Sequence, residues 1–156
     1  ASADESALLA AYDGFYDARI QIPAAGVNTQ IVQAYLDGVS WDVSSLGMNV
    51  GHLQGTNWMG EGMGNIVLSG HVELSDGRAG IFSNLGTLEA GDLIILQQGE
   101  REQRYTIAEV RNVQPDDLTP LYPTETDQLT LITCDDYNFL SDTYEERTII
   151  VAERIS

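Results

Sequence analysis

The feature that most constrains the fold is a succession of short β-like runs that begins at residue 19 and continues to the end of the chain. Each run is apolar or alternates apolar with polar residues, and turn-forming pairs such as Asp37-Gly38 and Asp76-Gly77 lie between them. The runs cover residues 19–22, 27–36, 65–68, 92–97, 105–113, 129–134 and 148–155. Strands this short and this numerous predict a mainly β sandwich or closed barrel, and a barrel also leaves no sheet edge exposed.

The segment that precedes these runs has a different period. Between residues 4 and 17, Leu8, Tyr12, Phe15 and Tyr16 recur at spacings of three and four, which predicts a helix with one apolar stripe. A single helical turn is expected at 81–85. Since the sequence contains no repeat and no linker, we expect a helical extension over residues 1–18 and one β domain over residues 19–156.

The charge of the chain excludes several kinds of partner. Its 156 residues carry 24 acidic side chains against 7 basic ones, and the formal net charge is −17. Such a surface repels phosphate backbones and anionic lipid headgroups, so we expect no nucleic acid and no membrane surface among its partners. No apolar stretch approaches the roughly 18 residues of a spanning helix. Because the sequence does not begin with methionine, we expect any signal or anchor segment to have been removed.

Cys134 is the only cysteine, so the chain can form no internal disulfide. It ends the apolar run at 129–134, and Arg147 stands immediately before the last run. A cysteine attacks as its thiolate, which needs a cationic neighbour or a base. A lone thiol at the end of a strand, with an arginine flanking the next strand, indicates a nucleophile with electrostatic support.

Only two histidines are available as the base, His52 and His71. His71 follows the apolar run that begins at Asn65, so it is expected where a buried strand meets a loop, within reach of a cleft. His52 lies in the glycine-rich segment 51–55, where we expect a loop and no strand to hold the side chain still. His71 is therefore the candidate base, and His52 is expected to have a structural role.

Three sequence elements resemble the sortase family. The segment Thr130-Leu131-Ile132-Thr133-Cys134 resembles the TLxTC signature, the triplet at 69–71 is similar to the histidine segment of that family, and Arg147 stands where sortases have an arginine before the last strand. Residues 133–138 are most similar to class A sortases, whereas residues 50–65 look more like class D, E or F. The resemblance extends from about residue 19 to residue 155.

This resemblance implies a closed eight-stranded β-barrel that acts as a cysteine transpeptidase. Cys134 is then the nucleophile that forms a thioester, His71 the general acid and base, and Arg147 the donor to the oxyanion or to substrate carbonyls. Sortases cut an LPxTG-like sorting motif and transfer the acyl group to an amine. The substrate-binding positions implied are Ser69, Ile132 and Thr133.

The resemblance also implies the partners of the protein and the place where it acts. The partners are a surface protein that bears a sorting motif and an amine from the cell wall or a pilin. The place of action is outside the cytoplasmic membrane, where an N-terminal anchor holds the full-length protein. We expect no cofactor.

Some class A sortases bind calcium near the histidine, but residues 51–70 contain only one acid, Glu61. Because a hard cation needs several oxygen ligands, we expect no dedicated metal site. The acidic residues of the loop at 116–127 are expected to form a solvated face, and a substrate-shaping role for that loop is the alternative that the resemblance suggests.

Two other kinds of protein stay open. One is a hydrolytic thiol enzyme, such as a cysteine protease or an L,D-transpeptidase, although the latter would be expected to carry a His-Gly-Cys cluster in one segment. The other is a non-catalytic β-barrel that only binds a peptide or packs against wall components. Acyl transfer to an added amine distinguishes the sortase from both.

Overall fold

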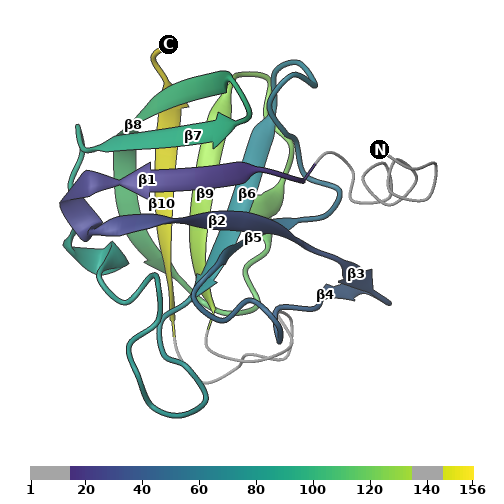
Figure 1. The fold of residues 1–156 in the computed structure, drawn as a ribbon, viewed down its shortest axis with the longest axis vertical. Helices are drawn as coiled ribbons and strands as arrows, with labels where there is room; N and C mark the ends of the chain where they lie inside the picture. The colour runs from purple at the N-terminus through teal and green to yellow at the C-terminus, as the bar shows by residue number, and fades with distance from the viewer. Residues whose placement is uncertain (1–14, 135–145) are drawn as a thin grey trace.

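Within residues 15–134 and 146–156, which a computed structural model of the chain describes, eight strands close into a barrel (Figure 1). The barrel strands are β1 (Ala18–Ile22), β2 (Val27–Ala34), β5 (Val50–Leu53), β6 (Asn65–His71), β7 (Leu93–Gln98), β8 (Arg101–Val113), β9 (Gln128–Cys134) and β10 (Arg147–Arg154). The eight-stranded, mainly β fold expected from the sequence is therefore confirmed.

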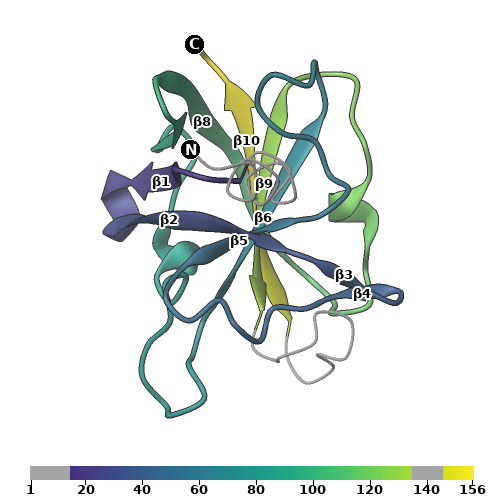
Figure 2. The same cartoon turned by 45° about the vertical axis from the view of Figure 1, so that its right-hand side comes forward.

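The order of strands around the barrel is β1-β2-β5-β6-β9-β10-β8-β7, and β7 pairs back onto β1. Two neighbouring pairs, β2 with β5 and β6 with β9, are parallel, and the other pairs are antiparallel. A short hairpin of β3 (Leu36–Asp37) and β4 (Ser40–Trp41) projects from the side of the barrel (Figure 2). The parallel pair β6–β9 brings two strand ends that are distant in the sequence to the same end of the barrel.

Alternation along the strands divides the apolar side chains into two cores. Ile66 and Leu68 of β6 point into the barrel with Leu129 and Leu131 of β9. Val67 of β6 and Ile132 of β9 face outward and belong to a second cluster, which comprises Ala34, Val43, Leu46, Leu53, Val67, Val113, Ile132, Cys134 and Ile149. Because both faces of β6 and β9 are covered, these strands have nearly continuous apolar sequences. The outer cluster contains the candidate nucleophile.

β5 is an element that the sequence analysis missed, and the placement of His52 in a loop was wrong. His52 lies in this four-residue strand, which pairs with β2 on one side and β6 on the other. A Cβ at Gly51 would approach the side chains of Leu46 and Ala34 to 2.8 and 3.2 Å, so glycine permits close packing there. A short strand that contains glycine lacks the alternating β pattern, so the sequence of this segment indicates a loop.

The expected N-terminal helix over residues 4–17 lies mostly outside the described residues. Where the two overlap, at residues 15–17, the chain is not helical. Asp17 has a φ of 55°, a left-handed conformation that a right-handed helix does not continue through. β1 begins at Ala18, one residue before the expected boundary.

Short 3-10 turns account for the remaining helical geometry within the described residues. They are η1 (Pro23–Ala25), η2 (Leu85–Thr87) and η3 (Thr119–Leu121). The helical turn expected at 81–85 is a series of turns that leads into η2. η3 lies in the long connection between β8 and β9.

Candidate active site

His71 and Cys134 meet because β6 and β9 are parallel neighbours in register. His71 is the last residue of β6, Cys134 is the last residue of β9, and the two are Cα partners in the ladder. The Cys134 Sγ lies 3.6 Å from the His71 Nδ1, although 63 positions separate the residues in sequence. Both side chains are buried, at 1% and 5% exposure. The structure thus brings together the thiol and the imidazole that the sequence singled out.

A backbone carbonyl orients the imidazole of His71. The other ring nitrogen, Nε2, lies 2.8 Å from the carbonyl oxygen of Val43. Since a carbonyl oxygen only accepts, Nε2 carries a proton and Nδ1 is the nitrogen that exchanges a proton with the sulfur. The group that orients this histidine is thus a main-chain carbonyl, which the sequence does not single out.

The turn at residues 42–44, which contains Val43, is held by a carboxylate. Asp42 Oδ1 accepts hydrogen bonds from the Ser44 N–H at 2.9 Å and from the Ser44 hydroxyl at 2.5 Å. These bonds favour the ionised form and lower the pKa of Asp42. The Val43 side chain is completely buried in the outer cluster. The peptide unit that carries this carbonyl is therefore fixed by the bonded Ser44 N–H on one side and by the buried Val43 side chain on the other.

The loop that follows β6 fixes the backbone of His71. The Phe82 N–H donates to the His71 carbonyl at 3.0 Å, and the Val72 N–H donates to the Cys134 carbonyl at 3.2 Å. A Cβ at Gly80 would collide with the His71 carbonyl, so only glycine permits this approach without movement. The strand-end histidine thus has little backbone freedom.

Arg147 reaches the same face from the third strand. It is the first residue of β10, and Ile149 of that strand is the partner of Ile132 in β9. Continuing this antiparallel register by two residues places Arg147 level with Cys134. Alternation also puts Arg147 on the outward face that Ile149 shares with Cys134. The arginine is only 2% exposed, which separates it from an ordinary surface cation.

Two of the three predicted substrate-binding residues, Ser69 and Ile132, lie on the outward face that carries Cys134. Ser69 is the ladder partner of Ile132, two residues before His71 and Cys134 respectively. The Ser69 Oγ is fully buried and has no hydrogen-bond partner within the described part of the chain. Buried hydroxyls normally have a partner, so this one is an exception on the outward face of β6.

Thr133 differs from these two residues. Its hydroxyl accepts a hydrogen bond from the Thr148 N–H at 2.9 Å, which joins β9 to the start of β10. Alternation turns its side chain away from the face that carries Cys134. In this structure, Thr133 positions the strand that carries Arg147.

His52 has the structural role that the sequence analysis expected. Its Nδ1 accepts from Gln33 Nε2 at 3.1 Å, and its Nε2 lies 2.8 Å from the Asn57 carbonyl, so the ring is a neutral tautomer with the proton on Nε2. The ring stacks on Phe15 with a centroid distance of 4.4 Å. Both ring nitrogens are therefore committed to neighbours in the fold.

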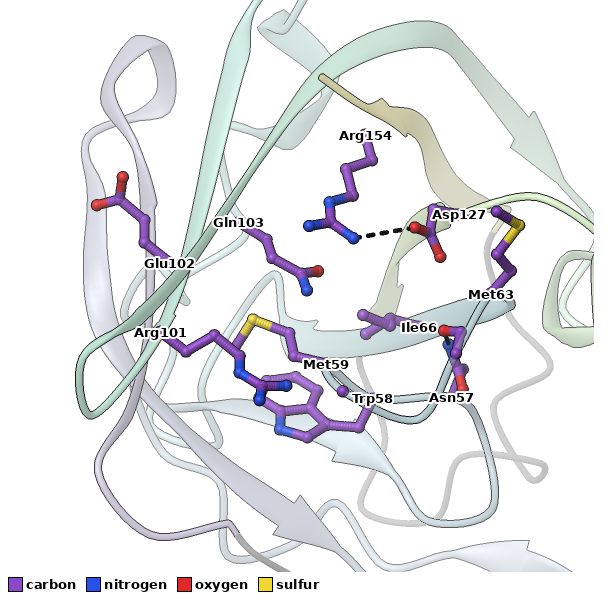
Figure 3. Close-up of a pocket in the computed structure, with 12 residues that line it drawn as sticks. Asn57, Trp58, Met59, Met63, Ile66, Arg101, Glu102, Gln103, Asp127 and Arg154 are labelled. Carbon is purple, nitrogen blue, oxygen red and sulfur yellow. Dashed lines mark hydrogen bonds and ion pairs between the residues drawn. The ribbon is translucent and has the colours of Figure 1, made fainter. Parts of the chain in front are cut away.

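A separate cavity of about 360 Å³ lies at the other end of the barrel (Figure 3). Figure 3 shows the ion pair between Arg154 and Asp127 above it, and Trp58, Met59 and Arg101 below it. None of the predicted catalytic or substrate-binding residues lines this cavity. Within residues 15–134 and 146–156, no group of three or more His, Cys, Asp or Glu side chains is arranged to hold a metal ion. No helix in those ranges has the length and apolar content needed to cross a membrane.

Comparison with known proteins is consistent with this architecture. The sortase domain matches residues 20–155. Sortase A of Staphylococcus aureus (strain NCTC 8325 / PS 47) is 34% identical over 93 residues, which are 58% of this chain and 45% of that protein. Sortase A of Bacillus anthracis is 37% identical over 73 residues, or 47% of this chain and 34% of that protein. Each of these two matches spans less than half of the relative's length.

A solved structure is similar over the whole chain. Sortase C-1 from Actinomyces oris superposes with a TM-score of 0.74 at 29% sequence identity, covering 100% of this chain and 84% of that one. Proteins named sortase A and sortase C are thus both similar to this chain.

Proposed function

Because this chain belongs to the sortase family, we propose that it is a cysteine transpeptidase that cuts an LPxTG-like sorting motif and passes the acyl group to an amine. Members of this family act in cell-wall anchoring or pilus assembly. The observation that carries the proposal is the distance of 3.6 Å between Cys134 Sγ and His71 Nδ1, with the Val43 carbonyl on the opposite ring nitrogen. The sortase class stays a prediction from the sequence.

In the first half-reaction, the Cys134 thiol gives its proton to Nδ1 of His71, and the resulting thiolate attacks the scissile carbonyl carbon of the motif. The new S–C bond turns the carbonyl into an oxyanion, and the intermediate collapses when the C–N bond breaks. His71 gives its Nδ1 proton to the departing amine while its Nε2–H remains bonded to Val43. The products are a thioester on Cys134 and a free amine.

In the second half-reaction, an incoming amine attacks the thioester carbonyl. Nδ1 of His71 takes the proton that this amine loses, the C–S bond breaks, and the Cys134 thiolate is regenerated. Each half-reaction uses the same nitrogen in opposite directions, so no net proton remains on the enzyme. An imidazole with one nitrogen fixed by a carbonyl is suited to this exchange.

Arg147 supplies the fixed positive charge. Its position level with Cys134 and on the same face lets the guanidinium stabilise the thiolate, the oxyanion or the carbonyls of the bound motif. In a buried site this interaction is stronger than in water, because little solvent competes for the charge.

The catalytic face also suggests how the peptide is held. Ser69 provides a buried hydroxyl, and Ile132 an apolar surface, along the strands that end at His71 and Cys134. The proposed partners are a sorting-motif surface protein and an amine of the cell wall or of a pilin. The proposed place of action is outside the cytoplasmic membrane, with the enzyme held there by an anchor.

The decisive experiment is incubation with a sorting-motif peptide, with and without an added amine, followed by mass spectrometry of protein and products. We expect a thioester on Cys134 and a product that contains the amine. Cys134→Ala should remove the adduct and lower the rate at least about 10⁴-fold, as loss of a catalytic nucleophile does in other enzymes. Its melting temperature shows whether the variant is folded.

The other outcomes have definite meanings. Cleavage that ignores the added amine would identify a hydrolytic thiol enzyme. No adduct on a folded protein whose thiol reacts with an alkylating reagent would leave a peptide-binding barrel, and the transferase proposal would be wrong.

A further inference from the structure

The cavity at the Arg154 end of the barrel is lined by the inward face of β8. Tyr105 and Ile107 of this strand belong to the core inside the barrel. Alternation continues their row outward to Gln103 and Arg101, and both of these residues line the cavity of about 360 Å³ (Figure 3). The mouths of β-barrels are common sites for small ligands, whose pockets start at roughly 300 Å³.

The amide of Gln103 has its oxygen fixed and its nitrogen turned to the cavity. Oε1 accepts the hydroxyl proton of Tyr105 at 2.7 Å, and Gln103 is only 8% exposed. No residue in the described part of the chain accepts a hydrogen bond from Nε2. Figure 3 shows this amide between Arg154 above and Met59 below. Buried N–H groups normally have an acceptor, and the cavity is the space from which one can reach this amide.

Arg101 brings a positive charge to the same cavity. Within residues 15–134 and 146–156, its guanidinium has neither a hydrogen bond nor an ion pair, although the chain carries 24 acidic side chains. The guanidinium lies against the backbone of Gly60, where a Cβ would collide with Nη1. Gly60 has a φ of 87°, which also favours glycine. The loop before β6 therefore makes room for the guanidinium beside the cavity.

The acidic side chains around the cavity are already paired. Asp127 pairs with Arg154 at 3.1 Å, and Glu102 alternates to the outer side of β8, where it pairs with Arg104 at 3.0 Å. The remaining charge is that of Arg101. A single cation with N–H donors beside it matches a carboxylate, which a guanidinium can bind through two parallel hydrogen bonds. The net charge of −17 disfavours a more highly charged anion such as phosphate.

The wall opposite these polar groups is apolar. Trp58, Met59 and Ile66 are buried and line it. The indole of Trp58 is held from behind, because its N–H donates to Gln98 Oε1 at 2.9 Å and its ring packs on Phe15 at a centroid distance of 4.3 Å. A fixed aromatic ring near a cation and an amide favours a ligand that has an apolar body next to its carboxylate.

We propose that this barrel mouth binds a small organic acid, with a carboxylate attached to an apolar body. Arg101 and the Gln103 amide bind the carboxylate, and the apolar body packs against Trp58 and Met59. The site lies at the other end of the barrel from Cys134. It does not depend on the transpeptidase function proposed above.

Titration of the full chain with phenylacetate, followed by NMR of isotope-labelled protein, tests the site. We expect the side-chain amide resonances of Gln103 and the indole N–H resonance of Trp58 to shift in a saturable way. Phenylacetamide, which has the same shape without the charge, and acetate, which has no apolar body, should each bind at least about tenfold more weakly. Phosphate that binds more tightly than phenylacetate would contradict the choice of a carboxylate.

Arg101→Gln removes the cation and should weaken phenylacetate binding about tenfold or more, because hydrogen bonds to charged groups are the stronger ones. Arg104→Gln is the matched control. It removes the same charge from the same strand, but on the outer side, and should change the affinity less than about twofold. Equal weakening in both variants would mean that only the net charge of the chain matters, and the proposed site would be wrong.

Gln103→Glu tests the amide donors. It keeps an acceptor for Tyr105 but replaces the N–H groups with an oxygen, so phenylacetate should bind at least about tenfold more weakly. If this buried variant does not fold, as its melting temperature will show, Arg101→Gln decides the question, since Arg101 is exposed. Parent affinity in Arg101→Gln, or no shift of the Gln103 and Trp58 resonances up to about 10 mM phenylacetate, would overturn the proposal.

Discussion

The strands β6, β9 and β10 have very different ends. At one end, His71, Cys134 and Arg147 are buried at 5%, 1% and 2% exposure. At the other end, β10 finishes in Arg154, whose side chain is 39% exposed and pairs with Asp127 at 3.1 Å beside an open cavity. The same strand thus begins and ends in an arginine, one buried and one half-exposed.

This difference shows how burial changes what a charge does. An exposed ion pair is screened by water and contributes little to stability. A buried cation loses much of its hydration, which costs free energy, but its field on neighbouring groups is stronger. We call the end with His71, Cys134 and Arg147 the candidate catalytic end, and the end with Arg154 the cavity end. We therefore expect the candidate catalytic end to govern activity and the cavity end to affect only stability.

In this comparison of the two ends, the largest effect is expected from Arg147→Lys. Arg147→Lys should lower kcat/KM for peptide cleavage about 10²–10³-fold, because lysine offers neither the planar fork nor its five donors. Arg154→Lys is the matched control at the other end of the strand and should stay within about twofold. Equal losses in both variants would show that the comparison between the two ends is wrong.

An intermediate effect is expected at Tyr105, near the cavity end. Its hydroxyl donates to Gln103 Oε1 at 2.7 Å, and burial raises the pKa of Tyr105 to about 12. The folded protein therefore keeps this proton at a pH where the unfolded chain, with a tyrosine pKa of about 10, loses it. The contribution is complete below about pH 10 and is lost as the pH rises towards 12, at most roughly 2.7 kcal/mol.

Tyr105→Phe should remove this alkaline dependence. The free energy of unfolding, measured by urea titration at several pH values from 9 to 12, should fall less steeply in the variant than in the parent. Tyr122→Phe, at a residue that is 60% exposed, is the control and should follow the parent curve. Parallel curves for Tyr105→Phe and the parent would contradict this prediction.

The smallest effect is expected from the exposed ion pair itself. Asp127→Asn should lower the free energy of unfolding by about 0.2–1 kcal/mol at low salt, and by less in 1 M salt, where the charges are screened. Denaturant titrations at the two salt concentrations measure the difference. A larger loss, or any loss of peptide cleavage, would mean that the cavity end contributes more than its exposure indicates.

Much of the candidate site at the ends of β6 and β9 could be predicted, because its side chains have rare identities at recognisable places. A lone cysteine after an apolar run and a histidine after another indicate strand ends. Their pairing depends on the parallel register of β6 and β9, which no local pattern encodes. The family resemblance supplied that link.

The remaining parts of the site leave little signal in the sequence. The group that orients His71 is the carbonyl of Val43, and a carbonyl is present at every residue. β5 was missed because four residues that include Gly51 do not show strand alternation.

The parallel ladder between β6 and β9 has a consequence for how the chain folds. Its partners are 63 positions apart, and strand pairing over such separations is slow because the closure of a long loop precedes its stabilisation. Before that step, the chain carries an ordinary thiol with no imidazole beside it. We therefore expect the reactivity proposed for Cys134 to arise together with the tertiary structure, because the thiol of an unfolded chain has no fixed imidazole beside it to activate it.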